Sequence, residues 1–161
     1  MLGQIQGSVN RTFIPSSYDN NDSLAKDTII KYLIGKGHTI ISSEENFSFD
    51  ITSEKDGKTY YSEVEIKTQW SGEWNPSWKE IRIPYRKHKL INKFKELDDG
   101  NAFLTFYVIR RDCQYAWGIE GSILAASDAK EVSGPTRGIA KGEYFFHIPY
   151  QDANLVKIGE A

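Results

Sequence analysis

Four charged residues near the middle of the chain have the types and spacing needed to hydrolyse a phosphodiester bond. Asp50 lies on one predicted strand, and Glu63, Glu65 and Lys67 occupy every second position of the next, which places them on one face. Mg²⁺ prefers hard oxygen ligands and retains several waters, so two carboxylates on neighbouring strands, with a backbone carbonyl such as that of Ile66, suffice to hold it. A lysine on the same side can orient or help deprotonate a water and balance the charge of a phosphorane-like transition state.

The two strands that carry these residues are predicted to form a hairpin. Apolar and polar residues alternate over 47–53 and 59–68, and Asp56-Gly57 between them is typical of a two-residue turn. This turn pairs residues whose numbers sum to 113, so Asp50 faces Glu63, with Glu65 one diagonal step away, about 7–8 Å between Cα atoms. A mostly apolar face pairs Phe47 with Ile66, Phe49 with Val64, and Ile51 with Ser62. The other face carries Ser48, Asp50 and Thr52 against Tyr61, Glu63, Glu65 and Lys67.

The remaining pattern predicts an α/β fold, a mixed central sheet flanked by helices in the order αβββαβ. A first helix is expected from Asp22 or Ser23 to Gly35 or Gly37, with the apolar stripe Ile29, Ile30, Leu33 and Ile34. A second helix should begin near Pro84 and end near Leu97, with the stripe Leu90, Ile91, Phe94 and Leu97. Further strands are expected at 38–43, 102–109, 115–119 and 144–148, and a short helix from about Gly121.

The composition limits the class of protein. The 161 residues include 39% hydrophobic ones and carry a net charge of -2, which predicts one folded domain and excludes a polybasic protein. The domain is expected to span 1–161, with a core over about 22–127 and additions over 128–161. A single cysteine excludes a disulfide framework and a zinc ribbon. The sequence contains no signal-peptide pattern and no run long enough to span a bilayer, so we expect a cytoplasmic protein without a membrane partner.

The segments Phe49-Asp50-Ile51 and Val64-Glu65-Ile66-Lys67 resemble the motif of the PD-(D/E)xK nuclease superfamily, which has a restriction-endonuclease-like fold. The resemblance covers about 22–127, and the small phage nucleases and archaeal-type Holliday junction resolvases look nearest. It implies that Asp50 and Glu65 bind Mg²⁺ or Mn²⁺ and that Lys67 is the catalytic lysine. Phe49 replaces the proline of the signature, a common variation that leaves the chemistry unchanged.

Three further residues are accessory candidates. Many relatives place a glutamate in the leading helix; here Asp27 borders the apolar stripe and could lean towards the site, or it could be an exposed acid near a helix N-terminus. Glu63 is an additional acid on the catalytic face, either a third metal ligand or the partner of a nearby lysine. Gln69 shares the face of Lys67 and could contact a phosphate or the attacking water.

A basic segment follows the charged strand. Seven basic residues and one acidic residue between Lys79 and Lys95 give this segment a net charge of +6. Since DNA presents one charge per about 1.7 Å of axis, a few of these side chains could hold a duplex near the carboxylates. The residues assigned to the DNA backbone are Arg82, Arg86, Lys87 and Lys89. The alternative is a solvated helix face without a ligand.

Trp70, Trp74 and Trp78 are spaced by four in a segment interrupted by Gly72 and Pro76, which predicts a structured loop. Such rings can stack on unpaired bases in nucleic-acid enzymes, and Trp70 is nearest to Lys67. They can equally form a small satellite core beneath the loop.

These features predict a metal-dependent DNA endonuclease, on branched or recombination and repair DNA. With one metal site per chain, an enzyme that cuts both strands would act as a homodimer. Two other classes remain open. One is a non-catalytic nucleic-acid-binding module that has kept the fold, and the other is an interaction protein whose tryptophan loop docks a partner.

Overall fold

The computed structural model describes residues 14–44, 49–127, 129–131 and 144–159, and a six-stranded mixed sheet forms its centre. The strand order is β10-β7-β6-β4-β3-β2, with β4 and β6 parallel and the other neighbours antiparallel. The bounds are β2 Thr39–Ser42, β3 Ile51–Lys55, β4 Lys58–Lys67, β6 Ala102–Arg110, β7 Tyr115–Glu120 and β10 Asn154–Lys157.

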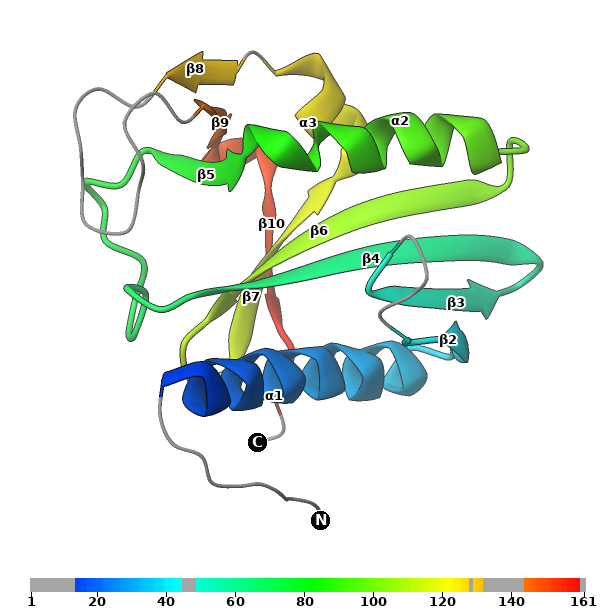
Figure 1. Cartoon of the computed structure of the whole chain (residues 1–161), viewed down its shortest axis with the longest axis horizontal. Helices are drawn as coiled ribbons and strands as arrows, with labels where there is room; N and C mark the ends of the chain where they lie inside the picture. Colours follow the sequence, from blue (N-terminus) through cyan, green and yellow to red (C-terminus); the bar gives the residue numbers. More distant parts are fainter. Residues whose placement is uncertain (1–13, 45–48, 128, 132–143, 160–161) are drawn as a thin grey trace.

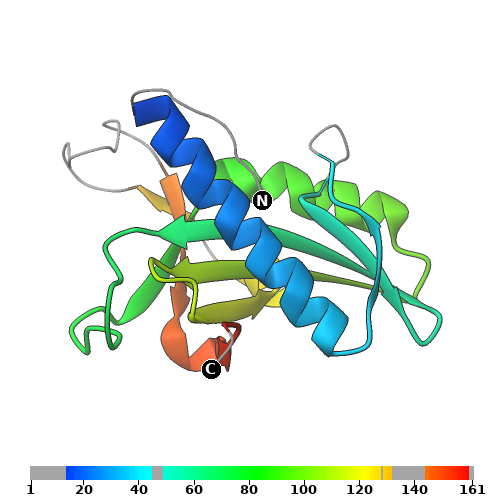
Figure 2. The same ribbon diagram turned by 90° about the horizontal axis from the view of Figure 1, so that it is seen from below.

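Helices cover both faces of this sheet. Helix α1 (Ile14–Gly35) crosses the strands on one face, as Figures 1 and 2 show. The other face is covered by α2 (His88–Leu97), α3 (Gly121–Ala126) and a three-stranded sheet in the order β5-β9-β8 (Figure 1). Its strands are β5 Glu80–Pro84, β8 Ala129–Glu131 and β9 Tyr144–Pro149. The 3-10 turns Tyr85–Lys87 and Tyr150–Asp152 follow β5 and β9. The predicted class, a mixed central sheet flanked by helices, is confirmed.

The sheet separates two hydrophobic clusters. The cluster beneath α1 contains Ala25, Ile29, Leu33, Ile51, Ile109, Cys113, Ala116 and Ile158, with Val64 and Ile66 packed against it. The larger cluster, on the side of α2, contains among others Phe49, Trp70, Ile81, Ile83, Leu90, Ile91, Leu104, Phe106 and Trp117. Strand β4 therefore lies between two packed layers, and each of its faces meets a different helix.

The hairpin of β3 and β4 has the predicted register. Ile51 pairs with Ser62, and Lys55 pairs with Lys58, so the partner numbers sum to 113. Asp56 and Gly57 form the turn with φ values of 53° and 78°. Positive φ at both central residues is typical of a type I′ turn, which matches the twist of the strands.

The strand prediction over 47–53 is wrong at Phe49. Strand β3 begins only at Ile51, and the chain bends at residues 49–50; residues 45–48 lie outside the described part. Phe49 packs against Tyr61, with ring centroids 4.7 Å apart, in the cluster on the side of α2 rather than opposite Val64. Alternation of faces holds only while the backbone stays extended, and the bend ends it.

Both predicted helices differ at their N-terminal ends. Helix α1 begins at Ile14, earlier than the predicted cap, and Ile34 of the predicted stripe is 55% exposed while Ala25 is buried. Pro84 ends strand β5 instead of opening a helix, and α2 begins at His88. The C-terminal additions are part of the fold, because β9 pairs with β5 and β10 pairs with β7. Among the described helices, none combines the length and apolar character needed to span a bilayer.

Candidate active site

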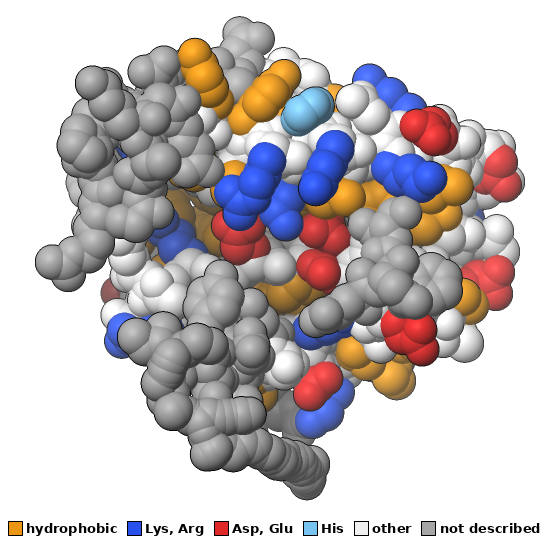
Figure 3. Space-filling model, viewed as in Figure 1, with side chains coloured by type: hydrophobic (Ala, Val, Ile, Leu, Met, Phe, Trp, Pro, Cys, Tyr) orange, Lys and Arg blue, Asp and Glu red, His pale blue; other side chains and the backbone are white. Residues whose placement is uncertain are grey.

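The odd-numbered residues of β4 point towards α2 and β5. Tyr61 packs in the α2-side cluster, whereas Val64 and Ile66 pack beneath α1, as strand alternation requires. Glu63 and Glu65 line a narrow space together with Ile83 of β5 and Lys87 of the 3-10 turn. Figure 3 shows acidic side chains directly beside Lys and Arg side chains in the middle of the face on which β4 passes α2.

Asp50 is joined to β4 by two hydrogen bonds that replace strand pairing at the bend. The Asp50 backbone N–H donates to Glu63 Oε2 at 2.7 Å. The Val64 backbone N–H donates to Asp50 Oδ2 at 2.9 Å. The structure thus brings Asp50 and Glu63 together as the register predicts, and it holds the Asp50 carboxylate at the edge of β4.

Glu63 is buried and paired with a lysine. Only 6% of the residue is exposed, and Lys87 Nζ donates to Glu63 Oε1 at 3.3 Å. Burial, and after it the neighbouring Asp50 carboxylate, raise the pKa of Glu63 to about 7, although Lys87 and the Asp50 backbone N–H act in the opposite direction. Of the two alternatives for Glu63, the ion pair with a nearby lysine is the one found.

Lys67 lies against an aromatic ring. Its Nζ is 5.1 Å from the centroid of the Trp78 ring, a cation–π contact. Burial lowers the pKa of Lys67, Arg82 lowers it further, and Glu65 opposes both. Trp74 holds the loop in place, since its indole N–H donates to the carbonyl of Trp78 at 2.9 Å. Sequence reasoning missed this role of Trp78, and the spacing of the tryptophans contains no signal for it.

Trp70 does not have the predicted position for stacking on a base. It is 2% exposed and packs against Trp74 and Trp117, with ring centroids 5.2 and 6.2 Å away. Its backbone carbonyl accepts the N–H of Arg111, which fixes the loop after β4 to the end of β6. The satellite-core alternative therefore describes Trp70, because the ring is enclosed by the α2-side cluster.

The other predicted residues are distributed around this face. Asp27 is exposed on α1, which packs against the opposite face of the sheet. Gln69 is exposed in the turn that follows β4, where strand alternation no longer sets its direction. The exposed basic residues are Arg82 on β5, Arg86 in the 3-10 turn and Lys89 on α2. Lys87 differs from them, since its side chain is only 22% exposed and engaged by Glu63.

The carboxylates fit a divalent cation of the Mg²⁺ type. One carboxylate oxygen of Asp50 accepts the Val64 N–H. The carboxylates of Asp50 and Glu63 repel each other, and a cation bound beside them would offset this repulsion. Within the described ranges no group of three His, Cys, Asp or Glu side chains could hold a metal by itself. A Mg²⁺ ion bound beside these carboxylates would keep several waters, as this ion usually does in proteins.

No model of a known protein family matches the chain, and no curated protein matches it.

Proposed function

We propose that the chain is a Mg²⁺- or Mn²⁺-dependent DNA endonuclease with a restriction-endonuclease-like fold. The observation that carries this proposal is that Glu63, Glu65 and Lys67 share one face of β4, with Asp50 held beside Glu63. Lys87, from the 3-10 turn that precedes α2, lies against this face. The mixed sheet with helices on both faces and the parallel pair of β4 and β6 are compatible with that fold.

Asp50 and Glu65 would hold the metal. When bound, the ion polarises the scissile phosphate and lowers the pKa of a coordinated water. Glu63 is a positioning residue, because its carboxylate accepts the backbone N–H of Asp50 and so fixes where the Asp50 carboxylate lies. Lys87 neutralises part of the charge of Glu63.

Lys67 is the proposed catalytic lysine. Its ammonium is half-buried and held by the Trp78 ring, so fewer waters compete with a phosphate for its hydrogen bonds. In this position it would orient the attacking water or stabilise the negative charge that develops on the phosphate.

Arg82, Arg86 and Lys89 would hold the DNA backbone. All three are exposed, and Figure 3 shows Lys and Arg side chains grouped beside the acidic face. Binding through such groups weakens steeply as salt rises. Since one chain carries one site, cleavage of both strands would require a homodimer.

The test is a cleavage assay on linear duplex, single strand, flap and four-way junction, with Mg²⁺, Mn²⁺ or EDTA. We expect cutting that EDTA abolishes and that Glu65→Gln lowers by at least about a hundredfold, since a metal-binding oxygen becomes an amide. The matched control is Glu54→Gln, an exposed carboxylate on β3. Cutting that persists in EDTA would contradict the proposal.

A non-catalytic DNA-binding module is the second candidate. The observation that favours it is that both Glu63 oxygens are already engaged, by the Asp50 N–H and by Lys87. It predicts salt-sensitive DNA binding with no cutting under any metal.

Trp78 provides a narrower prediction. Trp78→Leu removes the ring beneath the Lys67 ammonium, and a cation–π contact of about 0.5–2 kcal/mol corresponds to a cleavage rate about two- to thirtyfold lower. Trp78→Phe keeps an aromatic face and should recover most of the rate, which single-turnover kinetics would measure. Equal rates for the leucine and phenylalanine variants would show that the ring does not position Lys67.

A further inference from the structure

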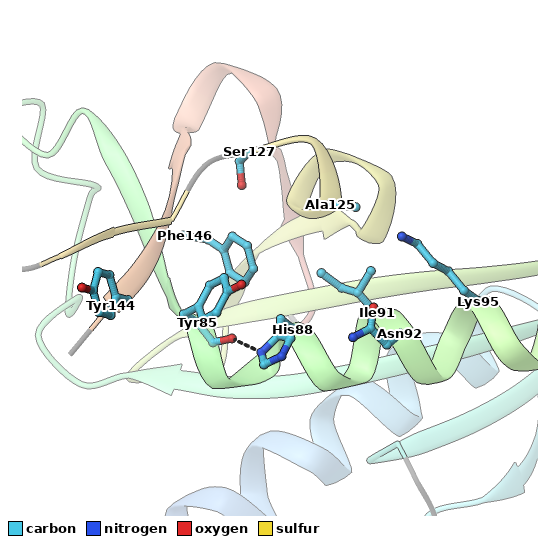
Figure 4. A pocket seen from close by; sticks show the side chains of 9 residues that line it. All are labelled: Tyr85, His88, Ile91, Asn92, Lys95, Ala125, Ser127, Tyr144 and Phe146. Atoms are coloured by element: carbon cyan, nitrogen blue, oxygen red, sulfur yellow. Dashed lines mark hydrogen bonds between the residues drawn. The ribbon is translucent and has the colours of Figure 1, made fainter. Parts of the chain in front are cut away.

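An open pocket lies between α2 and the segment formed by α3 and β9, across the 3-10 turn Tyr85–Lys87 from the carboxylates of the proposed site. Its volume is about 780 Å³, within the range of about 300–1,000 Å³ typical of small-molecule sites. Figure 4 shows Tyr144 at one end and Lys95 at the other, with the Tyr85 and Phe146 rings and Ile91 between them and Ser127 and Ala125 across the opening. None of the residues proposed for DNA cleavage lines this pocket.

One wall of the pocket is aromatic. The Tyr85 and His88 rings are stacked with centroids 4.7 Å apart and an angle of 15°, and Phe146 lies 5.1 Å from Tyr85. The His88 ring is oriented by the backbone carbonyl of Tyr85, 3.0 Å from its Nδ1 (Figure 4). Tyr85 is 40% exposed and Tyr144 is 49% exposed, so both residues of this lining are accessible to a ligand. Flat nucleobases stack on such surfaces regardless of their identity.

The remaining lining supplies the polar groups that a nucleotide requires. Asn92 presents an amide, which can donate to and accept from the edge of a base. Lys95 carries the ammonium needed for a phosphate.

The pocket and the proposed cleavage site are adjacent along the chain. Lys87, whose Nζ reaches Glu63, immediately precedes His88, and Arg86 and Lys89 flank this pair in the sequence. A DNA strand held by the 3-10 turn would therefore have the carboxylates on one side and the aromatic pocket on the other.

We propose that this pocket binds an unpaired nucleotide of the DNA substrate. The inference rests on the proposed nuclease function and narrows it to DNA that carries unpaired nucleotides, such as a bulge or a single-stranded flap. Pairing and stacking keep a base of intact duplex out of such a pocket, so continuous duplex would bind without using it.

The test measures binding in EDTA, where the DNA stays intact. The probes are a fluorescent duplex and the same duplex with one unpaired 2-aminopurine. The wild-type chain should bind the bulged duplex roughly fivefold or more tightly, and should change the 2-aminopurine fluorescence as the base stacks. Tyr144→Leu and Tyr85→Leu should each bring the affinity ratio towards one. Because the Tyr144 ring is half-exposed, its replacement leaves the core intact. Phe103→Leu, which removes an equally exposed ring outside the pocket, should keep the ratio.

The possible results separate the two proposals. A wild-type ratio near one, or a ratio that neither tyrosine variant changes, overturns the pocket inference. Binding of free deoxyadenosine monophosphate that depends on Tyr144, without any preference for bulged DNA, assigns the pocket to free nucleotides and also overturns it. A retained preference for bulged DNA without cleavage under any metal overturns only the nuclease proposal. Absence of all DNA binding overturns both.

Discussion

Replacing Lys67 with alanine is expected to lower DNA cleavage by about 10²–10⁴-fold while the chain stays folded. The ammonium is half-buried beside Glu65, and the Trp78 ring holds it 5.1 Å from its centroid. Neither apolar cluster contains Lys67, and Val64 and Ile66 of the same strand continue to pack beneath α1. Single-turnover cleavage with Mg²⁺ measures the effect, and urea unfolding checks that the variant is folded.

The matched control for this variant is Lys58→Ala. Lys58 lies on the same strand, is exposed, and places its ammonium 5.7 Å from the Phe103 ring, so it also makes a cation–π contact. It does not neighbour the carboxylates of the proposed site, and its loss should change cleavage by less than about twofold. A Lys67→Ala rate within tenfold of the wild type, or equal losses in the two variants, would contradict the assignment of Lys67.

The charged face of β4 was predictable because its signals are local. Alternation over ten residues sets the faces, and Asp56-Gly57 sets the register, so the contact between Asp50 and Glu63 follows from two short-range rules. Each rule concerns neighbouring residues along one hairpin. The part of the site that depends on this hairpin, Asp50 with Glu63, is the part that sequence reasoning located.

The second wall of the site depends on pairing over long distances. Strand β5 exists because it pairs with β9, more than sixty residues further along the chain, where Ile81 faces Ile148. Its five residues end in Pro84, which in isolation is equally typical of a helix start. Nothing local distinguishes these outcomes, so no strand was predicted over Glu80–Pro84, and the position of Arg82 near Lys67 was not foreseen.

Burial of the tryptophans is likewise a tertiary property. Spacing by four in a loop allows either a stacking surface or a packed cluster, and the choice depends on Trp117 and Tyr150 at distant positions. The bend at Phe49 has the same origin, because the Phe49 ring packs against Tyr61 on the α2 side of the sheet, not on the α1 side that alternation predicts. In both cases the packing partner, absent from the local pattern, decides the position of the side chain.

Lys87→Met is expected to destabilise the chain by about 3 kcal/mol, at the lower end of the range for breaking a buried ion pair. The Glu63 side chain is 8% exposed and that of Lys87 is 22% exposed, with 3.3 Å between Nζ and Oε1. Without the ammonium, the buried Glu63 carboxylate keeps the hydrogen bond from the Asp50 N–H at 2.7 Å and repels the Asp50 carboxylate. Urea unfolding at pH 8, above the pKa of about 7 that Glu63 has in the wild-type fold, measures the loss, which includes any cost of protonating Glu63 once Lys87 no longer lowers its pKa.

Two further variants distinguish this structural role from the DNA contact that the sequence predicted for Lys87. Lys89→Met removes an exposed ammonium from α2 and should change stability by less than about 0.5 kcal/mol. Adding Glu63→Gln to Lys87→Met removes the unpaired charge, so the double variant should regain part of the lost stability. A Lys87→Met variant that is as stable as the Lys89→Met control would show that the pair adds nothing to the fold. Glu63 accepts the backbone N–H of Asp50, the proposed metal ligand. That result would therefore also mean that the ion pair of Glu63 and Lys87 does not fix the position of Asp50.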